Sequence, residues 1–416
     1  MQAVPEVETK NIGLRGVTVA DTRISLVDGE QGLLTYRGFA IETLAQRSTF
    51  EEVVYLLLMG RLPSRSELAA TAGALRDWRA IPSSVEAYLR ARPRTARPMD
   101  VVQGGVTVLA DDDPALGSTN REDLVRSSLR LIARTATMAS RWLQLRSGRD
   151  GDPAAEARDT HAGAFLRGLW GRTPTADEVR LMDALLVLHA EHSLNASTFA
   201  AREVASTRAH LYASVSAAFG ALSGDLHGGA NAGVMKMLLE IGDESRVEKW
   251  VAERLKAGQR VMGLGHAVYV TTDPRAAILR DLAAEVLAGR EEERWFRLAM
   301  KVQEVARRRL REEKGLELYP NVDFFSSPVL YAMGIPIDMF PVFFGVSRTA
   351  GWCAHVIEET FAEAQPKPAL YRPEAEYVGR YCGPAGCEFV PIEDRGTGCP
   401  TGAEFKGCDG KAAGGS

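Results

Sequence analysis

Beyond about residue 40 of this 416-residue chain, apolar side chains recur at three- and four-residue intervals, which is the spacing of one face of an α-helix. The pattern is clear in the runs Leu124–Met138, Leu181–Leu188 and Val302–Leu310. A further helix is predicted to begin at Thr49, because a threonine followed by two glutamates and an apolar run is typical of a helix N-terminus. Almost no segment in this part alternates as a strand does. The sequence therefore predicts an all-α fold.

The exception lies within the first forty residues. Ile24 and Leu26 alternate with polar positions before the turn-forming segment Asp28–Gly32, and a second apolar run, Leu33–Tyr36, follows it. Two short runs on either side of an Asp-Gly turn predict a small β-hairpin. We expect this N-terminal hairpin to be a minor addition to a helical protein.

Charge and apolar content exclude two classes of function. The chain has 50 Lys and Arg against 54 Asp and Glu, so its formal net charge of −4 supplies no basic field for a nucleic acid or an anionic bilayer. The longest compact apolar run, Val53–Met59, is too short to cross a membrane. Residues Met1–Lys10 carry neither a secretory nor a transit signal. We expect a soluble, cytoplasmic protein with no nucleic-acid or membrane partner.

The cysteines are confined to the end of the chain. All five follow residue 350, which does not fit a secreted protein stabilised by disulfides. After Gly379 the composition shifts to Gly, Cys and short polar residues, and a loose tail is predicted from about Asp394. Zinc binding is an alternative for the last four cysteines, but their intervals are irregular, so no metal site is expected. These four are Cys382, Cys387, Cys399 and Cys408.

Three of the seven histidines lie in polar or Gly-rich segments between predicted helices: His192, His227 and His266. His227 precedes a Gly-Gly pair, where the missing side chains let a ligand approach the backbone. His266 lies nine residues before Arg275, which places an imidazole and a cation on one loop. Taken singly, each of the three is as readily structural as functional. Structural roles are expected for His161, His189, His210 and His355.

Two charged residues have apolar neighbours. Asp323 lies among aliphatic and aromatic residues, where desolvation raises the basicity that a general base for a weakly acidic C–H bond requires. A turn or helix N-cap aspartate is the structural alternative. Arg348 lies one turn after Phe344 in an otherwise apolar helix and needs a partner anion, for which a bound carboxylate is a natural candidate.

Several long stretches resemble the citrate synthase family, in the right order and over nearly the whole chain. They are residues 13–38, 188–198, 226–231, 262–275, 319–324 and 334–355. The resemblance implies an all-α, two-domain fold and an obligate homodimer with the active site in the cleft. It places a large helical domain at 1–229 and 341–393, a small domain at 230–340 and a tail at 394–416.

The resemblance also implies the reaction, which condenses acetyl-CoA with oxaloacetate and hydrolyses citryl-CoA to citrate and CoA, a step of the tricarboxylic acid cycle. Asp323 would remove a proton from the acetyl methyl group. His227 would donate a hydrogen bond to the thioester oxygen, and His266 would polarise the ketone of oxaloacetate. No metal or redox cofactor is required, since the CoA thioester is a substrate.

Further residues are implied in substrate binding. The oxaloacetate residues are His192, Asn195, Arg275, Phe344, Arg348 and Arg372, the last delivered from the partner subunit. The CoA residues lie in the loop 261–268 and are Met262, Gly263, Leu264, Gly265 and Ala267.

Two alternatives to citrate synthase stay open. One is 2-methylcitrate synthase, which uses propionyl-CoA, because the sequence departs from many relatives at Asp225, Val270 and Glu374. The other is a catalytically silent relative, which the intact set of catalytic histidines, Asp323 and three arginines disfavours.

Overall fold

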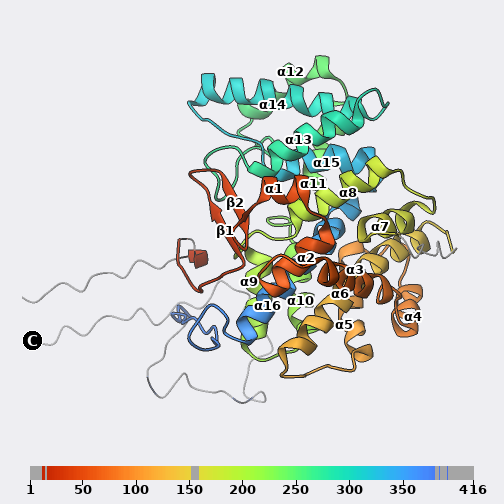
Figure 1. Ribbon diagram of the computed structural model, residues 1–416. Helices are drawn as coiled ribbons and strands as arrows, with labels where there is room; N and C mark the ends of the chain where they lie inside the picture. Colours follow the sequence, from red (N-terminus) through yellow and green to blue (C-terminus); the bar gives the residue numbers. More distant parts are fainter. Residues whose placement is uncertain (1–11, 15, 151–158, 380–383, 385–390, 392–416) are drawn as a thin grey trace, which may run out of the picture. The chain divides into compact units, whose positions relative to one another are not determined.

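Helices dominate the computed structural model, which describes residues 12–14, 16–150, 159–379, 384 and 391 (Figure 1). The first α-helices are α1 (Ile41–Arg47), α2 (Phe50–Met59), α3 (Arg65–Asp77), α4 (Ser83–Ala91), α5 (Pro98–Val108), α6 (Arg121–Arg146), α7 (His161–Trp170) and α8 (Ala176–His189). The others are α9 (Ala196–Ser206), α10 (Leu211–Leu222), α11 (Ala230–Ile241), α12 (Val247–Lys256), α13 (Pro274–Leu287), α14 (Glu293–Lys314), α15 (Val322–Ala332) and α16 (Phe340–Thr360). Short 3₁₀ helices span Ile12–Leu14, Leu109–Asp112, Glu244–Arg246 and Ile337–Met339. The predicted all-α fold is confirmed.

The predicted hairpin is also present. Strands β1 (Ser25–Asp28), β2 (Leu33–Tyr36) and β3 (Phe39–Ala40) form one antiparallel sheet in that order. Asp28 lies opposite Leu33 and shapes the turn, since its carboxylate accepts backbone hydrogen bonds from Glu30 and Gln31 at 3.0 and 2.9 Å.

Local caps explain where individual helices begin and end. The Thr49 hydroxyl accepts the backbone N–H of Glu52 at 3.3 Å, so α2 begins where the sequence predicts. The helix ends at Met59 and is followed by Gly60, whose φ of 79° is a left-handed conformation that glycine adopts at little cost. Asp273 caps α13 with proline in the first turn.

The described residues up to Leu370 belong to one compact unit and those from Tyr371 to a second. Within the first unit, helices α11 to α15 contact one another, as the upper part of Figure 1 shows. Helix α13 also contacts α1 and α8, and α11 contacts α16, so this group is joined to the remaining helices. The division into domains at 1–229, 230–340 and 341–393 stays a prediction.

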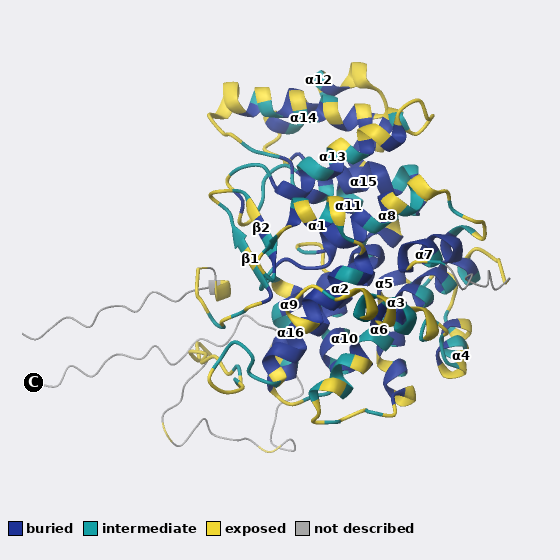
Figure 2. Ribbon diagram, in the orientation of Figure 1, coloured by how far each residue is buried: buried dark blue, intermediate teal, exposed yellow. Residues whose placement is uncertain are grey.

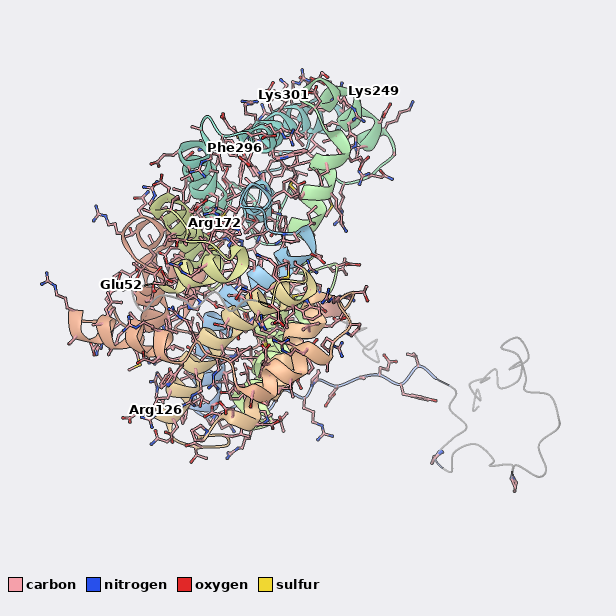
Figure 3. All side chains as sticks on the ribbon, turned by 90° about the vertical axis from the view of Figure 1, so that its right-hand side faces the viewer. Glu52, Arg126, Arg172, Lys249, Phe296 and Lys301 are labelled. Atoms are coloured by element: carbon pink, nitrogen blue, oxygen red, sulfur yellow. The ribbon has the colours of Figure 1, made fainter. Side chains whose placement is uncertain are left out.

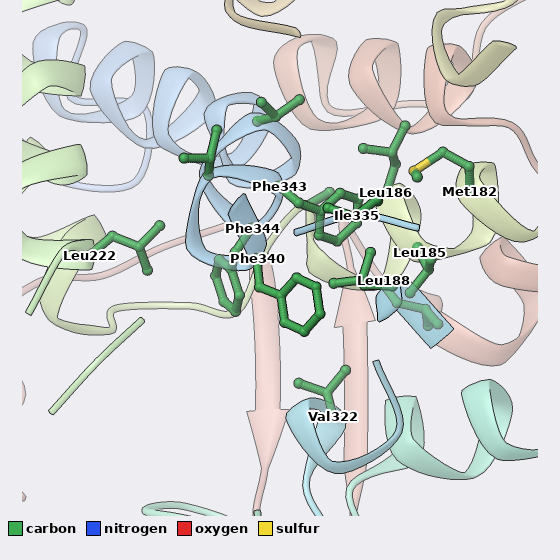
Figure 4. Packing of buried hydrophobic residues seen from close by; sticks show 14 of the residues in the cluster. Met182, Leu185, Leu186, Leu188, Leu222, Val322, Ile335, Phe340, Phe343 and Phe344 are labelled. Atoms are coloured by element: carbon green, nitrogen blue, oxygen red, sulfur yellow. The ribbon is translucent and has the colours of Figure 1, made fainter. Parts of the chain in front are cut away.

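Helix α16 runs through the interior of the first unit. Nearly all its residues are buried, as Figure 2 shows in dark blue, and it packs against α2, α6, α8, α9 and α10. Figure 4 shows its phenylalanines beside leucines of α8. Helix α14 is amphipathic by contrast. In Figure 3 its Lys301 projects outward, while the Phe296 ring lies 6.0 Å from that of Phe325 in α15.

Candidate active site

Two of the predicted site histidines meet although they come from distant loops. His192 follows α8 and His266 lies between α12 and α13, yet their ring centroids are 5.4 Å apart. The Tyr269 hydroxyl lies 3.1 Å from Nε2 of His192. Burial, followed by the positive charge of Arg275, keeps the pKa of His192 well below its usual value. His192 is therefore a neutral hydrogen-bonding group.

The backbone fixes the protonation state of His266. Its Nδ1 accepts hydrogen bonds from the backbone N–H groups of Val268 and Tyr269 at 3.0 and 3.2 Å. Burial and the nearby Arg275 lower the pKa of His266 to about 4. Because Nδ1 accepts two N–H donors, the single proton of the neutral ring is on Nε2. His266 thus presents a neutral Nε2–H donor.

His227 is held in the opposite tautomer. Its Nε2 accepts the backbone N–H of Ser197 at 3.3 Å and lies 2.8 Å from the Ser197 hydroxyl. Burial and the charge of Arg348 lower the pKa of His227 to about 4. The neutral ring therefore carries its proton on Nδ1. Asn195 positions the partner serine, because it caps α9 and its Oδ1 accepts from the Ser197 hydroxyl at 2.8 Å.

Arg275 is fixed by the aspartate two residues before it. Its Nε and Nη2 donate to the two carboxylate oxygens of Asp273 at 3.0 and 2.8 Å, and both side chains are buried. Asp273 also accepts the backbone N–H of Val322 at 3.1 Å. One carboxylate thus connects Arg275 to the first turn of α15, which carries Asp323.

Arg348 has no such partner. It is 1% exposed, its Nε donates to the backbone carbonyl of His189 at 2.7 Å, and its guanidinium carbon lies 4.8 Å from the centre of the Phe344 ring. No carboxylate of the described residues forms an ion pair with it. Burial lowers its pKa to about 10, which leaves it charged near neutral pH. A buried, unpaired guanidinium is suited to a ligand carboxylate.

Asp323 is the second residue of α15, and Asn321, not Asp323, caps this helix. The expected N-cap alternative for Asp323 therefore does not apply. None of the described residues donates a hydrogen bond to its carboxylate. Burial raises its pKa to about 6, although the charge of Arg275 opposes the shift. Asp323 is thus a carboxylate with raised basicity.

Hydrogen bonds from Asn321 hold the predicted CoA loop, residues 261–268, next to the start of α15. Asn321 donates its backbone N–H to the Gly263 carbonyl and its side-chain amide to the Gly265 carbonyl, each at 3.0 Å. Gly263 has φ +77°, and a Cβ there would lie 2.7 Å from Val234 and 2.9 Å from Phe324. Met262 and Leu264 are partly buried, whereas Ala267 is exposed.

The remaining predicted residues belong to other parts of the chain. Arg372 is exposed and belongs to the second unit. The tail 394–416 and the four late cysteines, Cys382, Cys387, Cys399 and Cys408, lie outside the described residues. Within the described part of the chain, no cluster of His, Cys, Asp and Glu has an arrangement that holds a metal ion.

Comparisons with known proteins identify the family. A family model described as citrate synthase, C-terminal domain, matches residues 13–374. A citrate synthase from Synechocystis is 38% identical over 391 residues, which cover 92% of this chain and 93% of the relative. The chain belongs to the citrate synthase family. As a member of that family it is an acyltransferase-type enzyme, as the sequence predicts.

A solved structure and a further relative are also similar to this chain. The Thermoplasma acidophilum citrate synthase was solved in ternary complex with carboxymethyl coenzyme A and oxaloacetate. It matches with a TM-score of 0.84 at 32% identity, covering 93% of this chain and all of that one. A 2-methylcitrate synthase from Shewanella oneidensis is 35% identical over 369 residues, covering 88% of this chain and 94% of the relative. None of the helices described here is long and apolar enough to span a membrane.

Three residues with contacts in the site were not predicted as site residues: Ser197, Tyr269 and Asp273. All three lie in stretches that carry the resemblance to the citrate synthase family. The contact of Asp273 with Arg275 could have been predicted from the sequence, because an aspartate before proline predicts a helix N-cap whose carboxylate faces the next residues. The contacts of Ser197 and Tyr269 have no local signal, since their partners are 30 and 77 residues away.

Proposed function

We propose that this chain condenses acetyl-CoA with oxaloacetate and hydrolyses the resulting citryl-CoA to citrate and CoA. The observation that carries the proposal is the buried Arg348, which lacks a carboxylate partner among the described residues. Its charge acts on Asp323 and His227, so a bound anion, a base and a neutral donor share one electrostatic environment.

Oxaloacetate binds first in this mechanism. Arg348 and Arg275 neutralise its carboxylates, with His192 as a further neutral hydrogen-bonding group. Asn195 and Phe344 border the same region, since one positions Ser197 and the other lies under the Arg348 guanidinium. Fixing both carboxylates orients the ketone for attack.

Proton removal follows. Asp323 takes a proton from the methyl carbon of acetyl-CoA, and the C–H electron pair forms the enol carbon–carbon double bond. The thioester oxygen gains negative charge and accepts a hydrogen bond from Nδ1–H of His227. A pKa of about 6 gives Asp323 more basicity than an ordinary aspartate while it stays ionised near pH 7.

Carbon–carbon bond formation uses the second histidine. The electron pair of the carbon–carbon double bond forms the new bond to the ketone carbon of oxaloacetate, while the thioester carbonyl re-forms. The ketone oxygen becomes an alkoxide, which Nε2–H of His266 stabilises and which takes up a proton to become the hydroxyl of citryl-CoA. Water then adds to the thioester carbonyl carbon and the carbon–sulfur bond breaks, which releases citrate and the CoA thiol. The loop residues Met262, Gly263, Leu264, Gly265 and Ala267 hold CoA next to Asp323.

We further propose a cytoplasmic homodimer in the tricarboxylic acid cycle, with Arg372 reaching the oxaloacetate of the partner subunit. Mixing Arg372→Ala with Asp323→Asn subunits tests this arrangement. If Arg372 acts in trans, one of the two sites in each heterodimer has both wild-type groups, and activity returns. Purified heterodimers without activity would place Arg372 in the site of its own chain.

The second candidate function is 2-methylcitrate synthesis, which the similar Shewanella oneidensis enzyme favours. Acetyl-CoA and propionyl-CoA differ by one methylene, which a pocket discriminates by about 1–3 kcal/mol, or roughly 10–200-fold. The test compares kcat/KM for the two thioesters at saturating oxaloacetate. We expect the higher value with acetyl-CoA. A propionyl-CoA value that equals or exceeds it would favour the second function.

A further inference from the structure

The tip of the N-terminal hairpin touches the loop that carries His266. The backbone N–H of Val270 donates to the Gly29 carbonyl at 3.0 Å. Gly29 lies so close that a Cβ on it would be 2.1 Å from the Val268 carbonyl oxygen. On the other side of the turn, a Cβ on Gly32 would be 2.8 Å from Thr271. The reddish hairpin and the green loop are seen together in Figure 1.

This contact reaches the catalytic imidazole through a single peptide unit. The Val268 carbonyl that packs on Gly29 and the Tyr269 N–H that donates to His266 Nδ1 belong to the same planar group. A displacement of the carbonyl therefore also displaces the N–H. Gly29 thus limits the position of a donor that fixes the His266 ring and its tautomer.

The sheet is anchored at its other end to the segment that carries His192. The Ser25 hydroxyl donates to the Glu191 carboxylate at 2.9 Å and accepts the backbone N–H of Ser193 at 3.0 Å. The Tyr36 hydroxyl lies 2.9 Å from the Glu191 carbonyl. The same small sheet therefore contacts both sequence segments whose histidines meet in the site.

We propose that Gly29 is a positioning residue for the condensation: the hairpin tip holds the Val268–Tyr269 peptide so that His266 presents Nε2–H to the ketone. This inference rests on the proposed function, because it assumes that His266 polarises oxaloacetate. The small sheet thereby sets the relative position of His192 and His266, and a side chain at position 29 disturbs this arrangement.

Gly29→Ala tests the inference sharply. The φ of Gly29 lies outside the left-handed region, so alanine there brings a methyl group against Val268 without backbone strain. We expect kcat to fall about 10- to 100-fold, as for a misplacement of catalytic groups by up to 1 Å. Glu30→Ala is the matched control, because Glu30 lies in the same turn with an exposed side chain, and it should retain wild-type kcat.

A second readout does not depend on turnover. In ¹⁵N-histidine NMR spectra, His266 of the wild type should show a protonated Nε2 and an accepting Nδ1, with its signals assigned by their loss in His266→Gln. Gly29→Ala should shift the Nδ1 signal, and Glu30→Ala should not. Asp28→Ala, which releases the turn without adding an atom, should shift the signal in a protein that keeps its fold.

The outcomes separate this inference from the proposed function. Unchanged kcat and unchanged His266 signals in folded Gly29→Ala would overturn the positioning role. Equal losses in Glu30→Ala would also overturn it, because they would reflect a general effect of the turn. A wild-type enzyme that fails to condense acetyl-CoA with oxaloacetate would overturn the proposed function, while the NMR comparison would still decide whether Gly29 positions His266.

Discussion

Buried charged residues near the C-terminal end of helix α16 form ion pairs, whereas a buried arginine in the middle of the helix does not form one within the described part of the chain. Near its end, Glu358 and Glu359 are fully buried and paired with Arg202 of α9 at 2.8 and 2.7 Å. His355 lies 3.0 Å from the Glu191 carboxylate in the same cluster. About two to three turns earlier on the same helix, Arg348 is equally buried but has no carboxylate partner among the described residues.

The presence or absence of an ion-pair partner distinguishes buried charges with a structural role from those with a proposed role in binding a ligand. Removing an ion from water costs several kcal/mol, which a paired cluster offsets in part through its own contacts. An unpaired buried charge recovers that cost only when a ligand binds. Removing Arg202 would therefore leave two buried carboxylates without a partner, whereas in the proposed mechanism the charges of Arg348 and Asp323 are offset only when substrate binds.

The largest expected effect is on Asp323, the unpaired carboxylate. Asp323→Asn should reduce kcat by about 10²- to 10⁴-fold, because the amide cannot accept the methyl proton. Oxaloacetate affinity, measured by calorimetry, should stay nearly unchanged, because the base acts on the other substrate. Near-normal condensation by the purified variant would remove Asp323 from the mechanism.

The next effect compares the two buried arginines directly. Arg348→Met should raise the KM for oxaloacetate about 10- to 150-fold, which corresponds to a lost charged hydrogen bond of about 1.5–3 kcal/mol. Its melting temperature should equal or exceed that of the wild type. Arg202→Met should instead lower the free energy of unfolding by about 3–5 kcal/mol, since two buried carboxylates lose their partner. Equal destabilisation by both variants would contradict the distinction.

The smallest expected effect is a dependence on pH. Because burial raises the pKa of Asp323 to about 6, kcat/KM should fall about tenfold per pH unit below that value. A raised carboxyl pKa favours the protonated folded state, so its contribution to stability is lost as the pH rises through about 6. Asp323→Asn should therefore melt at a higher temperature than the wild type at pH 8, and this difference should shrink at pH 5. A constant difference would show that Asp323 does not titrate in this range.

Local signals predict much of this molecule. The hairpin follows from alternation around Asp28, and the start of α2 follows from Thr49, because turns and caps depend on residues close in sequence. The unusual character of Arg348 is also visible, since its apolar neighbours lie on its own helix. His355 and His210 have the expected structural roles, one in the Arg202 cluster and the other as the cap of α10.

Other features cannot be predicted from local sequence. Asp273 joins Arg275 to Val322, which lies 49 residues further along the chain. The hairpin contact with Val270 spans even more sequence, and only the packed structure brings Gly29 to that loop. Such pairs depend on tertiary packing, for which neither periodicity nor capping carries a signal.

The central position of α16 also has a consequence for how the protein is made. Helices α2, α6, α8, α9 and α10 all pack against it, yet it ends only at Thr360 and is translated after all of them. Until the ribosome has released that segment, the apolar faces of the earlier helices lack their common partner. Long-range contacts of this kind slow folding and leave surface open to aggregation. The nascent chain therefore exposes these apolar faces until α16 has emerged, which makes this stage of its synthesis the most prone to aggregation.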